Sequence, residues 1–222
     1  IGTFYFFLSI WAGLGGTMNS MLMRIELSKP GVFMGEHLYN VVVTSHALMM
    51  IFFLVMPMMV GGFGNWLIPL MLKFMDMLYA RLNSLSFWLV PGGLFLLFGS
   101  SLAEDGSGTG WTLYPPLSSI EGHSGPAVDY SSLSLHVAGA GSLVGAINFV
   151  ATIYNCRNYF MTPDKVTLFG WSVFITTGML IMAIPVLAGA ITMLLADRGF
   201  NTSFYDPTGL GDVVFVIHLF WF

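Results

Sequence analysis

His46 is the residue of this sequence whose position most clearly suggests chemistry. It lies about two turns into a long apolar run that begins near residue 39, and an ionisable side chain inside a membrane helix is a functional-site candidate by default. A neutral imidazole is a good ligand for haem iron or copper. A histidine hydrogen-bonded to a neighbouring helix would explain the position equally well, and one histidine does not make a metal site.

Two more residues could face the same membrane level as His46. Arg24 lies at the end of the first apolar run, and Trp111 lies in a long polar connection. Arg24 could extend to the lipid headgroups or donate hydrogen bonds to a carboxylate, carbonyl or propionate of a buried ligand. Trp111 could be an ordinary interfacial anchor or a rigid donor over the edge of a cofactor.

A second polar set is expected near the opposite side of the membrane. Amide and hydroxyl side chains can hold a chain of water molecules, and an aspartate at its mouth would collect protons. The residues alone favour a plainer interpretation for Asp76 and Asn83, a solvated loop aspartate and a helix-capping asparagine. The other members of the set are Asn65, Asn148 and Ser142.

The remaining histidines are expected to have structural or solvated roles. His136 lies near the outer end of the fourth apolar run, close to its first residue, where a hydrogen-bonded structural role is expected, while His37 and His123 are placed in solvated loops. The sequence offers no interpretation for His218.

The composition places most of the chain in lipid. Of 222 residues, 56% are hydrophobic and 8% are charged, whereas soluble domains are about 25% charged. The mean hydropathy is +0.80. The single Cys156 excludes a disulfide framework or a CxxC metal site. A net charge of −4 with seven Lys and Arg gives no nucleic-acid footprint.

The apolar runs predict an all-α fold, a polytopic transmembrane helix bundle of about five complete helices and the start of a sixth. Crossing the bilayer takes about 20 apolar residues, and the runs do not alternate as barrel strands would. Small residues inside them indicate close helix packing, or space for a flat cofactor. The runs span 3–23, 39–72, 84–102, 132–155 and 165–196, and the sixth begins near 213.

Loop charges predict an orientation. The connections after the second and fourth runs carry Lys73, Arg81, Arg157 and Lys165, whereas the connection 103–131 has acidic residues and no Lys or Arg. The positive-inside rule therefore places the first two connections on the side of the cytoplasm, or of an organelle matrix, and the acidic one outside.

Six segments, in order along the whole chain, resemble subunit I of cytochrome c oxidase, the catalytic subunit of the haem-copper terminal oxidases. They are 39–47 (YNVVVTSHA), 57–70 (PMMVGGFGNWLIPL), 108–117 (GTGWTLYPPL), 145–149 (GAINF), 187–201 (LAGAITMLLADRGFN) and 218–222 (HLFWF).

The resemblance assigns roles to individual residues. His46 matches the axial ligand of the low-spin haem, haem a, and Arg24 matches the arginine that hydrogen-bonds its formyl group. Trp111 matches the tryptophan beside the haem propionates. Asp76 corresponds to the mouth of a proton-uptake channel lined by Asn65, Asn83, Asn148 and Ser142, which reverses the plainer interpretation. Glu26 and Gly31 fall where many members bind a structural cation.

The resemblance also implies a redox-driven proton pump. Electrons from cytochrome c would pass through copper on another subunit to the haem bound by His46, then to a haem-copper site that reduces O2 to water. The expected partners are subunits II and III, cytochrome c, O2 and the lipid bilayer, with no nucleic acid. The expected location is the mitochondrial inner membrane, with a bacterial plasma membrane as the alternative.

Residues 1–222 are interpreted as a partial subunit I, truncated at both ends. The ligands of the second haem and of copper are expected beyond residue 222, so this stretch alone should not consume oxygen. The alternatives are a bacterial quinol oxidase of the same superfamily and an ion-coupled transporter using Asp76, Asn148 and the glycine-rich helix.

Some positions depart from the family pattern. Lys73, Phe74 and Met75 replace glycine, alanine and proline, and Gly141 occupies one of two serine positions. Because a lysine three residues from Asp76 favours the charged carboxylate, these departures bear on the efficiency of the channel.

Overall fold

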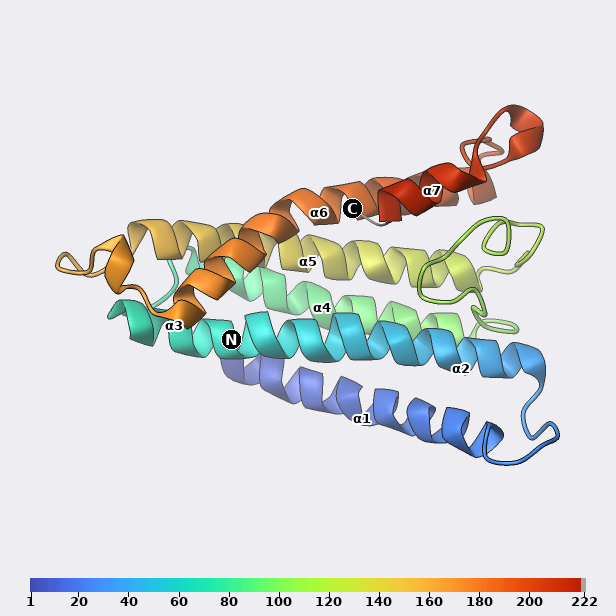
Figure 1. Ribbon diagram of the computed structural model, residues 1–222, viewed down its shortest axis with the longest axis horizontal. Coiled ribbons are helices and arrows are strands. Elements are labelled where there is room, and N and C mark those ends of the chain that lie inside the picture. The colour runs from blue at the N-terminus through green and yellow to red at the C-terminus, as the bar shows by residue number, and fades with distance from the viewer. Residues whose placement is uncertain (221–222) are drawn as a thin grey trace.

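All regular structure in the computed structural model is helical over residues 1–220, the part of the chain that it describes. Figure 1 shows the long helices running back and forth along one axis, with connections at both ends. The predicted polytopic helix bundle is confirmed. The α-helices are α1 (Gly2–Glu26), α2 (Glu36–Leu48), α3 (Asn65–Leu72), α4 (Ala80–Leu102), α5 (Ala127–Asn155), α6 (Leu168–Gly199) and α7 (Val213–Phe220).

The second predicted run forms one continuous helix over Glu36–Leu72. Between α2 and α3 it winds as two wider π-helical segments, η1 (Met49–Val55) and η2 (Pro57–Gly64). Pro57 has no N–H to donate to the preceding turn, and such wider turns occur where regular α-helical bonding is interrupted. The glycines of η2 also let neighbouring side chains approach the backbone here.

The helices extend beyond most of the predicted runs. α4 and α5 start four and five residues earlier than expected, because polar residues such as Asn83 and Asp129 lie inside them. α6 instead starts three residues later, at Leu168. The segment before it contains a 3₁₀ turn, η3 (Pro163–Lys165), and the Thr167 hydroxyl caps α6 by accepting a bond from the Gly170 N–H at 3.2 Å.

Four helices in the described part are long and apolar enough to cross a membrane, namely Glu36–Leu72, α4, α5 and α6. The remaining predicted span is α1, the first helix of the chain. It has 25 residues, but its second half contains the polar residues Thr17, Asn19 and Ser20. Its outer face is apolar and exposed along its length, as lipid contact requires: Phe4, Phe7, Trp11, Leu14, Met18 and Met21.

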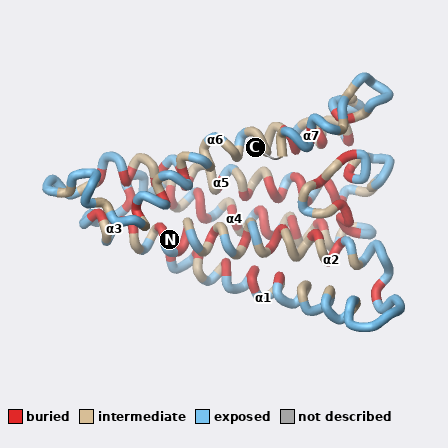
Figure 2. The backbone as a smooth tube through the Cα atoms, in the orientation of Figure 1, coloured by how far each residue is buried: buried red, intermediate tan, exposed pale blue. Residues whose placement is uncertain are grey.

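Buried residues lie on the facing sides of the helices, and the exposed ones lie on their outer sides and in the connections (Figure 2). Two connections, residues 73–79 and 156–167, lie at one end of the bundle, and the acidic connection 103–126 lies at the other (Figure 1). The charges that predict the orientation are thus separated between the two ends of the molecule.

Small residues let the helices approach closely, as the sequence predicts. A Cβ atom at Gly141 of α5 would lie 2.9 Å from the backbone oxygen of Ser86 and 3.2 Å from Cβ of Leu89, both in α4. A backbone atom cannot move aside as a flexible side chain can. Gly141 therefore permits the close approach of α4 and α5 at this position.

We predict that Gly141→Ala destabilises the protein by about 1–3 kcal/mol because it overpacks this contact. Gly178→Ala in α6 is the matched control, since nothing lies within 4 Å of the position that a Cβ atom would take there, and alanine favours a helix by about 1 kcal/mol. Thermal unfolding of the complete protein in detergent measures both. Equal unfolding temperatures for the two variants would contradict the assigned contact.

Candidate functional site

Within residues 1–220, His46 is hydrogen-bonded to a neighbouring helix through one of its two ring nitrogens and has no hydrogen-bond partner for the other. Its Nδ1 lies 2.7 Å from the backbone oxygen of Gly16 in α1. Because a carbonyl only accepts, Nδ1 carries the proton and the lone pair is on Nε2. Such a bond orients the imidazole of a metal-bound histidine and raises its basicity. The two interpretations of His46 are therefore compatible, since Nδ1 serves the structure and Nε2 remains available for a metal.

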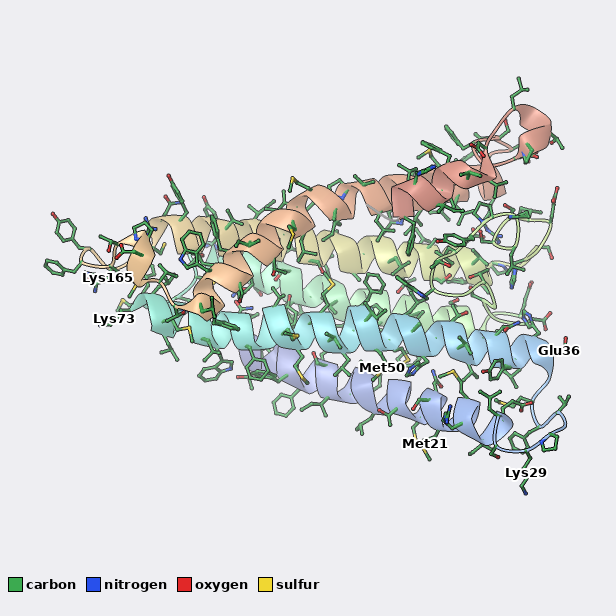
Figure 3. All side chains as sticks on the ribbon, viewed as in Figure 1. Met21, Lys29, Glu36, Met50, Lys73 and Lys165 are labelled. Carbon is green, nitrogen blue, oxygen red and sulfur yellow. The ribbon has the colours of Figure 1, made fainter. Side chains whose placement is uncertain are left out.

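Gly16 also packs closely against the long helix. A side chain there would place its Cβ 2.5 Å from Sδ of Met50, a residue of the long helix that Figure 3 labels at the contact with α1. Gly16 and the adjacent Gly15 recur in the first apolar run, so a sequence signal existed, but nothing in that signal connects Gly16 to His46.

The connection that carries Trp111 is attached to the helix that carries His46. The Gly110 N–H donates to the Thr44 hydroxyl at 2.9 Å, two residues before His46. The Trp111 side chain is 38% exposed, and its ring meets the edge of Phe220 in α7 at a centroid distance of 5.0 Å. The structure thus brings the loop of Trp111 to the level of His46.

Arg24 is exposed in the last turn of α1 and has no hydrogen bond or ion pair within residues 1–220. It follows Gly16 by eight residues, which corresponds to roughly 12 Å along the helix axis. Arg24 thus lies nearer than Gly16 to the end of α1, and its donors are available to a ligand.

A buried arginine that the sequence analysis missed positions the acidic connection. Arg198 of α6 donates from Nε to Asp129 of α5 at 2.8 Å. Its other nitrogens donate to three backbone oxygens of the connection, those of Ser118, His123 and Gly125, at 2.7–2.8 Å. The sequence shows Arg198 only as a charge near a helix end, since its partners are one carboxylate and three backbone oxygens about 70–80 residues away.

The expectation of solvated loop positions for His37 and His123 is confirmed only in part, because His37 is exposed but helical, whereas His123 lies in the connection but is half-buried. His37 lies in the first turn of α2 and bonds the Asp105 oxygen at 2.9 Å. His123 donates from Nδ1 to Leu117 at 2.7 Å and accepts from the Gly108 N–H at 3.2 Å. Both rings therefore fix the acidic connection. His136 has the structural role expected of it, with its nitrogens 2.9 Å from the Ser132 oxygen and the Thr192 hydroxyl.

Asp76 is exposed in the turn after α3, as expected for a residue at the mouth of a channel and for a solvated aspartate alike. Its Oδ1 accepts from the Met77 N–H at 2.7 Å. Asn83 is not the helix cap that the residues alone favour. Tyr79 precedes the first turn of α4, and Asn83 lies within the helix with 6% exposure.

Asn148 holds the turn that follows Asp76. It is completely buried, and its side-chain amide pairs with both backbone groups of Tyr79, at 3.0 Å to N and 3.3 Å to O. One turn later on α5, the Thr152 hydroxyl accepts from the Leu78 N–H at 3.0 Å. These bonds fix the position of the turn against α5.

Asn65 and Ser142 share a cavity of about 30 Å³ in the middle of the bundle, between the long helix, α1, α4 and α5. A cavity of this size holds one or two water molecules. Oδ1 of Asn65 is buried without a hydrogen-bond partner in residues 1–220, while its Nδ2 donates to Gly61 at 2.7 Å. An unpaired buried amide oxygen at a cavity wall is a site for a bound water.

Two residues that the sequence analysis did not select complete the polar wall of this cavity. The Tyr5 hydroxyl lies 3.0 Å from Oγ of Ser86, and Ser86 donates to the Asn83 oxygen at 2.7 Å. Tyr5 is therefore the donor in the first bond. The two residues belong to different predicted runs and are 81 positions apart, so their meeting follows from the packing of α1 on α4.

Glu26 forms hydrogen bonds across the connection between α1 and α2. Its carboxylate accepts from the backbone N–H groups of Phe33 and Met34 at 3.2 and 2.6 Å, and Gly31 has a φ of 115°, which favours glycine. These bonds explain the loop conformation without a cation. The assignment of Glu26 and Gly31 to a structural cation stays a prediction.

The whole chain, residues 1–222, matches the family model described as "Cytochrome C and Quinol oxidase polypeptide I". The chain belongs to this family. Proteins named cytochrome c oxidase subunit 1 are similar to all of it, with 52% identity in the fungus Eremothecium gossypii, 52% in Mytilus edulis and 48% in Pecten maximus. The matches cover 42%, 41% and 47% of those proteins, so the chain spans less than half of their length.

Haem and copper are expected in the cytochrome c and quinol oxidase polypeptide I family. The described residues fit a bound haem, because His46 offers Nε2 and Arg24, about two turns further along α1 than Gly16, has donors without a partner in residues 1–220. They do not supply a copper ligand set, since no three His, Cys, Asp or Glu side chains gather in residues 1–220. His218 lies in α7, and the last two residues of the predicted motif 218–222 lie outside the described residues.

We predict that Asn148→Leu loosens the turn that bears Asp76. The change leaves the N–H of Tyr79 without its side-chain acceptor, at a cost of about 1–3 kcal/mol, while the Tyr79 carbonyl keeps the bond that it accepts from the Asn83 N–H at 2.9 Å. Hydrogen exchange of the amides of residues 77–79 should accelerate at least tenfold. Asn155→Leu, at the exposed end of the same helix, is the control, and the same acceleration in both variants would contradict the role of Asn148.

Proposed function

We propose that the chain is part of the catalytic subunit of a proton-pumping cytochrome c oxidase, which reduces O2 to water with electrons from cytochrome c. The observation that carries this proposal is the His46–Gly16 bond, which orients an imidazole inside a membrane bundle with one nitrogen free. The names of the relatives support the same activity.

His46 would hold the low-spin haem iron through Nε2, with the Gly16 carbonyl fixing its ring plane and tautomer. By the family resemblance, Arg24 would donate to the formyl group of the haem, and Trp111 would be the tryptophan beside its propionates. When bound, haem a supplies one-electron redox chemistry at a potential set by its ligands and by neighbouring hydrogen bonds. Arg198 keeps the connection of Trp111 in place through its three backbone contacts.

Asp76 collects protons from the aqueous phase at the inner end of the bundle. Asn83, Asn65 and Ser142 line the route, with Asn148 fixing its entrance, and the Oδ1 of Asn65 holds water in the cavity. The Tyr5 and Ser86 hydroxyls extend this polar wall. Hydroxyls and water pass protons along hydrogen bonds, which apolar side chains cannot do.

The further components follow from the family. A second haem and copper form the oxygen site in the complete protein, and subunits II and III complete the complex. The multi-pass bundle belongs in the mitochondrial inner membrane, because these relatives come from eukaryotes. A quinol-oxidising relative is less well supported, since the same proteins are all named for cytochrome c.

We predict that His46→Leu in the complete oxidase removes the low-spin haem band from the reduced-minus-oxidised optical spectrum and lowers oxygen consumption at least a hundredfold. His136→Gln is the control, because both nitrogens of His136 already have protein partners. An unchanged band in His46→Leu would refute the ligand assignment. A complete protein without haem bands would instead support the transporter alternative.

Asp76→Asn should reduce the number of protons pumped per electron severalfold, because an amide cannot collect protons. Vesicles containing the complete oxidase would be given reduced cytochrome c and the external pH recorded. Asp105→Asn removes an exposed carboxylate from the opposite end of the bundle and should leave the ratio unchanged. The channel assignment fails if Asp76→Asn pumps as well as Asp105→Asn.

A further inference from the structure

A crevice beside the ends of α5 and α6 contains a cation without an anionic partner. The crevice has a volume of about 250 Å³ and is lined by Arg157 together with apolar and aromatic residues: Ile153, Tyr154, Pro163, Val166, Trp171 and Phe174. Arg157 is half-buried and has no hydrogen bond or ion pair within residues 1–220. A guanidinium in such surroundings favours an anion that brings apolar groups with it.

Contacts within the protein hold the crevice open. The guanidinium carbon of Arg157 lies 5.9 Å from the centre of the Tyr154 ring, which fixes the cation while leaving its N–H groups unpaired. The Trp171 indole donates to the Pro163 oxygen at 3.2 Å, and its ring packs edge-on against Phe174 at a centroid distance of 5.8 Å. The indole thereby holds the connection before α6 as the outer wall.

The acidic residue of the connection that contains Arg157 already has partners of its own. Asp164 follows Pro163 and is exposed. The Thr162 hydroxyl, its own backbone N–H and Lys165 hold the pKa of its carboxyl below the usual value. Asp164 therefore makes local bonds, and no carboxylate of the described residues pairs with Arg157.

The crevice lies at the basic end of the bundle. Lys73 and Lys165, labelled in Figure 3, are both at this end. The connections 73–79 and 156–167 and the first turn of α4 carry four basic and two acidic residues. Basic pockets between membrane helices on the cytoplasmic or matrix side bind anionic lipid headgroups.

An apolar strip leads from the crevice along α6 towards the middle of the bundle. Trp171, Ile175, Met179 and Met182 recur at helical spacing, and each is 40–61% exposed. They span eleven residues, or roughly 16 Å along the axis, which is enough to contact much of an acyl chain. A phosphate group at Arg157 would place the attached chain over this strip.

We propose that the crevice is a binding site for an anionic phospholipid, with the phosphate on Arg157 and an acyl chain along the exposed face of α6. The charge of Arg157 selects the headgroup, and the strip selects a lipid over free phosphate. The crevice shares no lining residue with the cavity of Asn65 and Ser142, and the lipid proposal does not depend on the proposed electron or proton path.

The experiment uses the complete complex that contains this chain, delipidated in mild detergent and titrated with phosphatidylglycerol or phosphatidylcholine while bound lipid is counted by native mass spectrometry. The unaltered complex should prefer phosphatidylglycerol. Arg157→Gln should lower that preference about fivefold, the effect of roughly one interfacial charge, and Arg157→Lys should retain part of it. Inorganic phosphate at equal concentration should not compete.

Lys73→Gln is the matched control, because Lys73 is an exposed cation at the same end and outside the crevice. An equal loss in Lys73→Gln would mean general surface attraction and would overturn the proposal. So would equal binding of the two lipids, displacement by inorganic phosphate, or protein covering the crevice in the complex. The haem spectrum of each variant reports folding and the proposed oxidase function separately from lipid binding.

Discussion

Hydrocarbon offers no hydrogen-bond partner to a peptide group, and this constraint determines most of the structure. The backbone must bond to itself, which makes the bundle helical, and a polar side chain between helices must find its partner on a neighbour. His46 with the Gly16 carbonyl, Ser134 with Gly93 and Asn148 with Tyr79 all do so. Two of these contacts use a glycine carbonyl, where the absent side chain leaves the oxygen accessible.

The helices were predictable because their signal is local. Runs of about twenty apolar residues define each span, and glycines at repeated positions predict close packing. The ends were less predictable, since Asn83 and Asp129 were treated as breaks although both are helical. Asn83 is buried against neighbouring helices and Asp129 is paired with Arg198, and these long-range contacts override the polar character that marks a helix end.

The residues of the candidate site were likewise predictable only in part. His46, Arg24, Asp76 and Asn148 were selected because an ionisable group or amide near a membrane helix is conspicuous by itself, and the family resemblance then gave each a role. Tyr5, Ser86 and Arg198 were not selected. Their partners are a side chain of a distant helix or backbone oxygens of a distant connection, and no spacing in the sequence encodes those pairs.

The bond between Nδ1 of His46 and the Gly16 oxygen also bears on the order of assembly. Both groups belong to the polypeptide, so the pairing of α1 with α2 selects the tautomer and aims the lone pair of Nε2 before any cofactor arrives. The entropy of fixing the ring is lost during helix association. If His46 is the ligand that we propose, the haem would enter a bundle in which this imidazole is already oriented.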